Sequence, residues 1–458
     1  MVRAVESPAS ANIRKGEWLL IAGLMIVTLV VHAASPVTTS TDSAWTFHLA
    51  ASILREGNVN LDEYRPLMDL ALDYRLRSIG SHIYYYYPAA TPLLVAPAVL
   101  LANALLPLRG SADLYTYLDS HAPDDRTARL EKLVASAIVA FAAVLMYLVA
   151  RQFGSRASSL LIAFIFAFGT SMWSTASRAL WQHGPSVLLA LVALYLTLAV
   201  PGRAWSIFTA GLVLAFAYLV RPTNSLSFAF FGLYYLLNQR RRFWAFLLGG
   251  LVVLVPYVAA NLAAYGNIFP PYSYQLFERL ATPPVFAEAL AGTLVSPNRG
   301  LFIFTPVFLF SVYGAVLAVR DSGLVQQNLN LYLLAIVTAH WITTSLFEDW
   351  GGAWSIGPRY FVDIIPYLVF LLLPVIASPA IRQSAWKFVF IATIGIGVVI
   401  QLRCAVSPYP FLWNGKPQAL VEAPERKWDW TDLQFLRGLC PTNPAEGMAP
   451  ACWMDHIG

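Results

Sequence analysis

Long apolar runs separated by short polar linkers dominate the pattern of this 458-residue chain. A membrane-spanning helix needs about 20 mostly apolar residues, and the strands of a transmembrane barrel would instead give short alternating segments. The runs therefore predict an all-α fold, a polytopic transmembrane helical bundle with about eleven spans. They cover residues 18–34, 133–150, 157–173, 185–200, 205–220, 225–238, 243–263, 301–319, 329–347, 360–378 and 386–402.

The basic linkers predict how this bundle lies in the membrane. Arg3, Arg14 and Lys15 precede the first run, and basic residues favour the cytoplasmic side. If the spans alternate, further basic linkers fall on that side, namely those with Arg151, Arg156, Arg203, residues 240–242, Arg320, Arg382 and Lys387. We therefore expect a multi-pass protein of the cell (inner or plasma) membrane, with a cytoplasmic N-terminus and an external C-terminus. A cleaved signal peptide is the alternative for the first run, but no A-x-A site stands out.

Residues 36–130 form a long external loop between the first two runs. Residues 88–107 within it are apolar enough to span, but Pro88, Pro92 and Pro97 would interrupt the helix hydrogen bonds. We expect this segment to lie in the outer leaflet or dip into it. The predicted organisation is a transmembrane domain over residues 1–403, whose loop 36–130 holds juxtamembrane helices, followed by an external tail over residues 404–458.

Composition agrees with a membrane protein and excludes several other classes. Hydrophobic residues make up 58% of the chain and charged residues 12%, whereas soluble proteins carry about 25% charged residues. Thirty basic against 25 acidic residues give a net charge of +5, too weak and dispersed to indicate nucleic acid. Three cysteines exclude a disulfide scaffold, although Cys440 and Cys452 are close enough in sequence for a disulfide in an oxidising compartment.

Four arginines fall on the external side, where the distribution of basic residues does not explain them. Arg178, Arg221, Arg299 and Arg359 sit in short external linkers or at helix ends. Charged groups held at one membrane level mark functional cavities, and the guanidinium fork matches phosphate oxygens. We therefore expect an anionic ligand. The alternative is that each arginine reaches lipid headgroups or pairs with a local acid, as Arg359 would with Asp363.

The external loop supplies the opposite charge. Residues 41–43 open a helical pattern that ends at Gly57, with an apolar face made by Trp45, Leu49 and Ile53. This places Asp42 at a helix N-terminus just outside the first span. Two roles stay open from the residues alone: an N-cap, and a general base held close to the bilayer.

Aromatic residues and one histidine complete the set of candidates. Four tyrosines at positions 84–87 precede Pro88, and an interfacial aromatic belt explains most such residues, with sugar stacking as the alternative. His183 starts a span near Arg178, with a structural role and a role in a ligand cavity both open. Nucleotide-binding, serine-hydrolase and metal-ligand motifs are absent from the sequence, so we expect no metal and no cofactor.

Taken together, these features resemble the GT-C superfamily of lipid-linked sugar transferases, above all protein O-mannosyltransferases and the aminoarabinose transferases of lipid A. The resemblance rests on an acid directly outside the first span and on Tyr87-Pro88-x-x-x-Pro92-Leu93 in the long loop. Other similar stretches are residues 41–64, 168–170, 181–183, 296–300, 350–352 and 357–360. The chain departs at Ser43, where O-mannosyltransferases often have a second acid, so acceptor specificity does not carry over.

The resemblance implies a membrane glycosyltransferase that moves a sugar, with inversion, from a polyprenyl-phosphate or diphosphate donor. The acceptor would be a glycan, lipid or protein on the external or periplasmic face. Asp42 would be the catalytic base, and further donor contacts would come from Arg178, Arg299 and Arg359, then from Arg221, His183 and Tyr87. A lipid-linked oligosaccharide flippase or channel without transferase activity is the main alternative, and an O-antigen ligase or polymerase is another.

Overall fold

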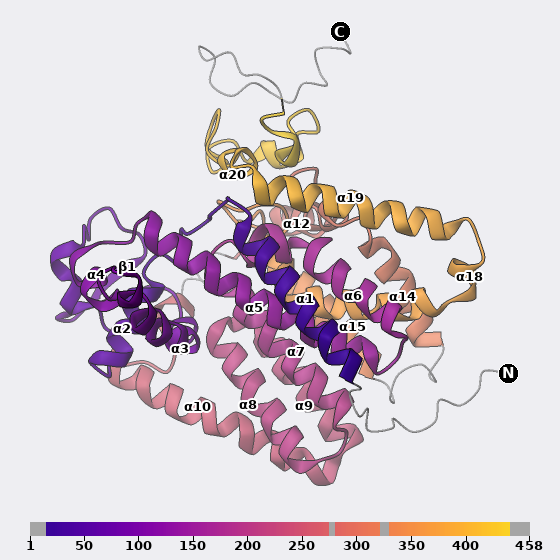
Figure 1. Ribbon diagram of the computed structural model, residues 1–458, viewed down its shortest axis with the longest axis horizontal. Helices are drawn as coiled ribbons and strands as arrows, with labels where there is room; N and C mark the ends of the chain where they lie inside the picture. The colour runs from indigo at the N-terminus through magenta and orange to yellow at the C-terminus, as the bar shows by residue number, and fades with distance from the viewer. Residues whose placement is uncertain (1–14, 274–279, 321–328, 440–458) are drawn as a thin grey trace.

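The computed structural model describes residues 15–273, 280–320 and 329–439, and within them it is a helical bundle with a single two-stranded hairpin (Figure 1). The predicted all-α membrane class is confirmed. Cys440 and Cys452 lie outside the described residues, so their disulfide stays a prediction.

Every predicted apolar run corresponds to helical structure. The continuous helices are α1 (Lys15–Ala34), α5 (Asp125–Arg151), α6 (Arg156–Phe168), α7 (His183–Ala199), α8 (Ala204–Val220), α9 (Ser225–Asn238), α10 (Phe243–Tyr265), α15 (Leu329–Ser345) and α19 (Trp386–Val406). Two runs are broken: α13 (Leu301–Phe304) precedes α14 (Phe308–Arg320), and η6 (Arg359–Ile364) leads into α16 (Ile365–Phe370) and α17 (Leu372–Ala377).

Shorter elements connect these helices. The loop after α1 contains α2 (Thr46–Arg55), η1 (Asp62–Leu67), β1 (Leu76–Ile79), β2 (His82–Tyr85), α3 (Ala90–Leu105), η2 (Pro107–Arg109) and α4 (Leu114–Ser120). The remaining elements are η3 (Met172–Ala176), η4 (Pro222–Asn224), η5 (Arg240–Arg242), α12 (Pro283–Val295), α18 (Pro379–Arg382), α20 (Tyr409–Leu412), η7 (Pro424–Trp428) and η8 (Gln434–Leu436).

Several helical segments have the length and apolar character needed to cross a bilayer. In the described residues these are Gly16–Ala34, Asp125–Arg151, Arg240–Tyr265, Arg359–Ala377 and Trp386–Val406, accompanied by six shorter apolar helices. Large apolar side chains such as Val255, Val312 and Val399 stay exposed along the bundle, as a lipid-facing surface requires. The chain is therefore a multi-pass membrane protein, while the count of eleven spans stays a prediction.

Polar contacts at both ends of α1 and α5 show that these helices run antiparallel. Glu17 at the start of α1 accepts a hydrogen bond from Arg151 Nε at the end of α5, at 2.7 Å. At the other end, Lys132 Nζ donates to the carbonyl oxygen of Ser35 at 2.8 Å. The alternating directions that the basic linkers predict hold for this pair.

Helices α8 and α10 approach each other backbone to backbone. A Cβ added at Gly211 would lie 2.1 Å from the carbonyl oxygen of Phe246, and one at Gly249 would lie 2.0 Å from that of Phe208. Small residues permit such close approach between helices in lipid, where van der Waals packing replaces the hydrophobic effect. The pair therefore forms a tight unit that fixes Arg221 at the end of α8.

A hairpin that the sequence analysis did not predict lies in the external loop. Strands β1 and β2 are antiparallel, with Leu76 opposite Tyr85 and Ile79 opposite His82. Gly80 opens the two-residue turn with φ of 61°, a conformation that glycine adopts without strain. The hairpin places Tyr86 and Tyr87, which follow β2, beside the start of α7 and the end of α8.

The segment at residues 88–107 is a more regular helix than its prolines suggested. It forms α3 without a break over Ala90–Leu105. Pro92 sits in the first turn, where no helical N–H bond is lost, and Pro97 lies inside the helix, where one such bond is missing. The helix packs against α2 and α8. Its position in the outer leaflet stays a prediction.

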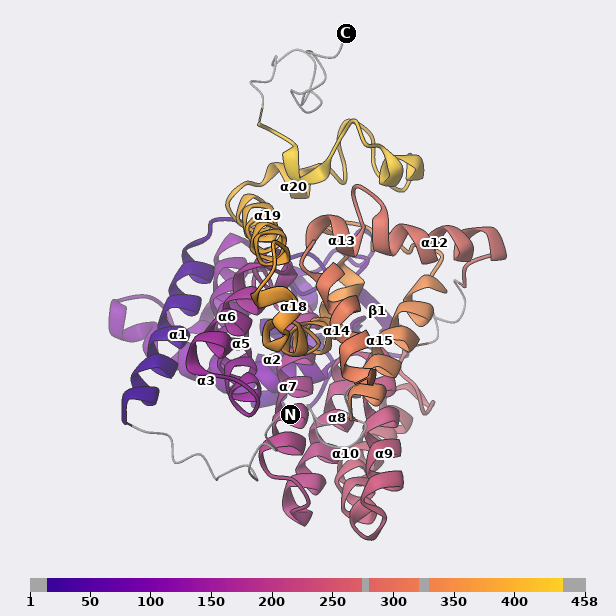
Figure 2. The same cartoon turned by 90° about the vertical axis from the view of Figure 1, so that its right-hand side faces the viewer.

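The described part of the tail packs onto the bundle. Figures 1 and 2 show it beyond the end of α19 and above α12. Trp428 donates to Glu288 of α12 at 2.9 Å, and Asn298 Nδ2 donates to the carbonyl oxygen of Arg426 at 2.9 Å. The division of the chain at residue 403 remains a proposal, because α19 itself continues to Val406.

Candidate active site

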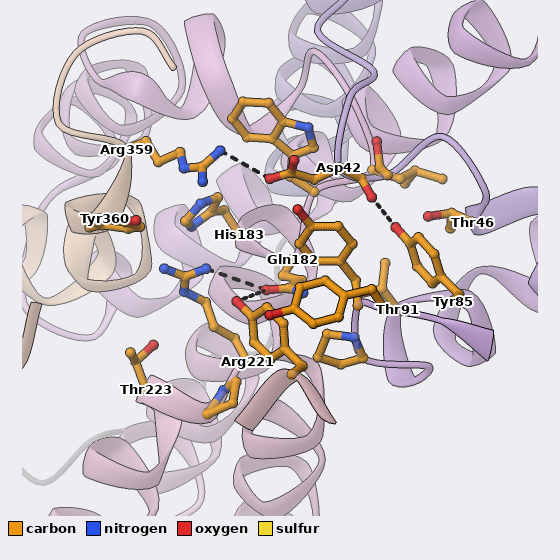
Figure 3. A pocket seen from close by; sticks show the side chains of 18 of the residues that line it. Asp42, Thr46, Tyr85, Thr91, Gln182, His183, Arg221, Thr223, Arg359 and Tyr360 are labelled. Carbon is orange, nitrogen blue, oxygen red and sulfur yellow. Dashed lines mark hydrogen bonds and ion pairs between the residues drawn. The ribbon is translucent and has the colours of Figure 1, made fainter. Parts of the chain in front are cut away.

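A cavity of about 270 Å³ opens between the external loop and the nearby helix ends. Its walls come from the turn before α2, the segment after β2, the start of α7, the end of α8, and the loop from α15 to η6. Figure 3 shows Arg359 and Arg221 on one side of the cavity, with Tyr85 and Thr46 across from them. Segments that are far apart in sequence thus meet at one site.

Asp42 lines this cavity, but it is not the helix cap that the sequence predicted. Helix α2 begins only at Thr46, and its N-cap residue, Trp45, makes no capping bond through its side chain. The preceding turn is held instead by long-range bonds: the Tyr85 hydroxyl donates to the Asp42 carbonyl oxygen, and Arg75 Nη1 donates to that of Thr41 at 3.2 Å. The Asp42 carboxylate is therefore free of capping and faces the cavity.

Two donors hold the Asp42 carboxylate. The Tyr74 hydroxyl donates to Oδ1 at 3.0 Å, and Arg359 Nη1 donates to Oδ2 at 3.2 Å. Burial and the nearby Asp42 charge raise the pKa of Tyr74 and of Tyr87 well above their ordinary value. Both phenols therefore keep their protons at neutral pH and can donate hydrogen bonds.

Arg359 pairs with Asp42. The alternative from the sequence, a local pair with Asp363, is not formed. The cause is local geometry: η6 is a 3₁₀ helix, in which residues three apart align and residues four apart diverge. The Arg359 guanidinium lies 4.9 Å from the ring centre of Trp181, so the cation is also placed over an aromatic face. Its side chain is 14% exposed and reaches the cavity.

Asp363 instead joins Arg221 and His183 in a buried cluster. Its Oδ2 forms an ion pair with Arg221 Nε, and its Oδ1 lies 3.2 Å from His183 Nδ1. Arg221 Nη1 also reaches Gln182 Oε1 at 3.5 Å, as Figure 3 shows. Arg221 and His183 both line the cavity, and so does Tyr87.

The structure does not bring Arg178 to this cavity. Arg178 is fully buried, and its Nη1 donates to the carbonyl oxygen of Ser35 at 3.1 Å, while Nη2 donates to that of His32. Its Nη2 also donates to Ser177 Oγ at 2.9 Å. The guanidinium fastens the end of α1 to the start of α7 and has no open side for a phosphate.

Arg299 is likewise engaged away from the cavity. It is 1% exposed, its Nη1 donates to Gln434 Oε1 at 2.8 Å, and its Nη2 donates to Asn414 Oδ1 at 2.5 Å. Burial lowers the pKa of Arg299 to about 9, which still leaves it protonated at neutral pH. Arg299 ties the tail to the loops beside η6. Its predicted contact with phosphate has no geometric support.

Several buried polar atoms of the cavity-lining residues have no hydrogen-bond partner among the described residues. They are Thr91 Oγ1, Trp181 Nε1, Gln182 Nε2, Thr223 Oγ1 and Arg359 Nε, while Arg221 Nε has only its ion pair with Asp363. Buried polar groups are nearly always paired with protein or with ordered water. Because the indole and amide groups are donors, acceptor oxygens of water or of a ligand would satisfy them.

Sequence reasoning missed several of these residues. Tyr74 could have been suspected only through the hairpin, which Gly80-Ser81 between two short apolar stretches does signal. Tyr272 and Thr223 carry no local signal, because long-range packing brings them to the cavity. Within the described ranges, no group of three or more His, Cys, Asp or Glu residues gathers that could hold a metal ion.

Comparison with known proteins is informative only at the level of structure. Neither a family model nor a curated protein matches the sequence. The apo form of ArnT from Cupriavidus metallidurans matches with a TM-score of 0.50 and 12% identity, covering 88% of this chain and 65% of that one. Archaeal oligosaccharyltransferase AglB from Archaeoglobus fulgidus, in complex with an inhibitory peptide and a dolichol-phosphate, matches with a TM-score of 0.50 and 11% identity, covering 94% and 62%.

Both of these proteins are GT-C glycosyltransferases. The chain has the GT-C fold. At identities this low the likeness establishes architecture, and the alignments cover 65% and 62% of the chains in these two structures. The GT-C architecture expected from the sequence is thus confirmed, while the roles of the individual site residues stay predictions.

Proposed function

We propose that this chain is an integral membrane glycosyltransferase that moves a sugar from a polyprenyl-phosphate or diphosphate donor to an acceptor. The observation that carries the proposal is the contact between Asp42 and Arg359 on the wall of a cavity with unpaired polar groups. A carboxylate and a guanidinium side by side provide a base for the acceptor and a cation for the leaving phosphate. The GT-C fold supports this reading.

In the proposed reaction the acceptor hydroxyl or amine attacks the anomeric carbon in a single displacement, which inverts it. The bond from that carbon to the phosphate oxygen breaks, and its electron pair leaves with the phosphate. Asp42 takes the proton of the acceptor, while Arg359 exchanges its carboxylate partner for the phosphate oxygens. Tyr74 keeps its bond to the other Asp42 oxygen and holds the carboxylate in place.

A second cavity fits the lipid part of the donor. It measures about 350 Å³, shares the wall made by residues 85–88, and continues between α3, α8 and α10 past Leu93, Phe216 and Val252. An apolar cavity beside a polar one suits a ligand with a hydrocarbon chain and a charged head. AglB was solved with dolichol-phosphate, a ligand of this kind.

Among the predicted site residues, Asp42 keeps its proposed role as the base, and Arg359, Arg221, His183 and Tyr87 keep theirs at the donor. Arg178 and Arg299 do not, because their guanidinium groups are bound to protein oxygens elsewhere. We further propose that the cavity opens to the external or periplasmic face, with the N-terminus in the cytoplasm and the tail outside, as the basic linkers indicate.

The test uses the full-length protein in nanodiscs with radiolabelled sugars on undecaprenyl phosphate. Sugar transfer to a lipid, glycan or protein acceptor, with release of undecaprenyl phosphate, is the expected result. Reconstitution into liposomes tests the flippase alternative in parallel. Lipid translocation without transfer from any donor would overturn the transferase proposal.

A further inference from the structure

One fully buried carboxylate next to the cavity has no role in the reaction proposed above. Glu131, in the second turn of α5, is 0% exposed. Its Oε2 accepts a hydrogen bond from Ser43 Oγ at 2.5 Å and its Oε1 accepts one from Ser40 Oγ at 2.9 Å. A third, longer bond comes from the backbone N–H of Leu180 at 3.4 Å.

These three bonds join two separate parts of the cavity wall. Ser40 and Ser43 flank Asp42 in the turn before α2, and Leu180 directly precedes the Trp181-Gln182-His183 segment that starts α7. Glu131 itself does not line the cavity. The carboxylate thus lies behind the wall and holds the turn that carries Asp42 against the segment that carries Trp181 and His183.

The energetics make a purely packing role a poor explanation. A buried carboxylate is costly, and no Lys, Arg or His forms an ion pair with Glu131 in the described part of the chain. An apolar side chain of similar volume would fill the same space at lower cost. What a carboxylate adds is the ability to accept several hydrogen bonds in fixed directions at once.

We infer that Glu131 is a positioning residue, whose carboxylate sets Asp42 relative to the Trp181–His183 side of the cavity. The inference rests on the transferase function proposed above. Catalytic groups must be held in near-attack geometry, and a misplacement of about 1 Å costs roughly 10²-fold in rate. Because Glu131 does not reach Arg359, its loss should affect turnover and leave donor binding nearly intact.

The first test compares Glu131→Gln with a control variant at another buried carboxylate that contacts α5. The amide keeps the size of the side chain but replaces one accepting oxygen with a donor, so one serine hydroxyl can no longer donate to that position. We expect kcat to fall by about 10- to 100-fold, with undecaprenyl phosphate binding in nanodiscs changed less than threefold.

The control is Glu17→Gln, which alters a buried carboxylate of α1 that bonds to the other end of α5. Glu17 is 7% exposed and is bonded to Tyr147 and Arg151, so its loss should lower thermal stability. Arg151 lies 20 residues along α5 from Glu131, about 30 Å for a helix. Wild-type kcat in Glu17→Gln together with reduced kcat in Glu131→Gln supports the inference. Wild-type kcat in folded Glu131→Gln overturns it.

A second measurement separates this inference from the transferase proposal. Hydrogen exchange of residues 36–45 should accelerate in Glu131→Gln and in Ser43→Ala, but not in Glu17→Gln. If wild-type protein transfers no sugar but this pattern appears, the transferase function fails and the anchoring role stands.

In a double-mutant cycle, Ser43→Ala should add little to the kcat loss of Glu131→Gln, and additive losses would overturn the inference. Should Glu131→Gln fail to fold, Ser43→Ala alone carries the kcat and exchange tests.

Discussion

Two pairs of arginines in this structure have opposite surroundings. Arg221 and Arg359 reach the cavity and pair with carboxylates, whereas Arg178 and Arg299 lie in seams between segments and bond mainly to carbonyl oxygens. All four look alike in the sequence, since each is an unexplained external arginine. The difference shows that the supply of nearby acceptors decides what a buried arginine does.

Arg178 and Arg299, the seam arginines, hold distant segments of the chain together. Arg178 bridges segments 143 to 146 residues apart in sequence, and Arg299 bridges segments up to 135 residues apart. The cavity arginine Arg359 instead holds a carboxylate that faces open volume, so an arriving anion can take the place of that partner. Stability and ligand binding should therefore respond differently to the loss of each arginine.

The largest effect on stability should come from the seam. Arg178→Ala and Arg299→Ala each remove at least two charge-assisted hydrogen bonds, worth about 1.5–3 kcal/mol apiece, and strand buried acceptors. We expect a loss of about 3–6 kcal/mol in thermal or denaturant unfolding, or failure to accumulate folded protein. Arg241→Ala, at an exposed linker, is the control. Folded Arg178→Ala with wild-type stability but weaker lipid binding would restore Arg178 to the ligand site.

Arg221 belongs to both environments, so its loss should show both effects. It lines the cavity, yet it also forms a buried ion pair with Asp363. Breaking such a pair costs about 3–5 kcal/mol because a charge is left unpaired. Arg221→Ala should therefore lower stability and weaken undecaprenyl phosphate binding together. A drop in stability with unchanged binding would place Arg221 among the seam arginines.

Arg359→Ala should weaken binding with little change in stability. One charge-assisted bond to a phosphate is worth about 1.5–3 kcal/mol, hence roughly one to two decades in Kd for undecaprenyl phosphate. Binding can be measured in nanodiscs by native mass spectrometry beside an unfolding curve. Equal affinity in wild type and Arg359→Ala would remove this arginine from the donor site.

Tyr74→Phe should have the smallest effect. It deletes one neutral donor to Asp42, worth about 0.5–1.5 kcal/mol, so kcat should fall roughly 2- to 10-fold with donor binding unchanged. Tyr117→Phe, which removes a phenol far from the cavity, serves as the control. A larger fall in donor affinity than in kcat would contradict the role given to Tyr74.

The architecture could be predicted from the sequence because it follows from local composition. Apolar runs such as those of α5 and α19 become helices wherever their partners lie, since lipid requires backbone bonds to close within the segment. The sequence also singled out Asp42, His183 and Tyr87, and all three line one cavity. These features depend on single segments and on their order.

The predictions that the structure does not support concern side chains whose partners are distant in sequence. The Asp42 turn is shaped by Tyr85 and Arg75, and Asp363 is taken by Arg221 and His183, none of which a local pattern indicates. The seam roles of Arg178 and Arg299 rest on His32, Ser35 and the tail residues Asn414 and Gln434. The unexplained arginines were visible in the sequence, but their acceptors were not.

The most direct test of the account is sugar transfer by Asp42→Asn in nanodiscs, with undecaprenyl phosphate binding measured on the same sample. The amide keeps the size of the side chain and can still accept the Tyr74 hydrogen bond, so folding should be preserved. It removes the charge that takes the acceptor proton, so turnover should fall by roughly 10²-fold or more while lipid binding stays. Wild-type turnover in a folded Asp42→Asn protein would contradict the account.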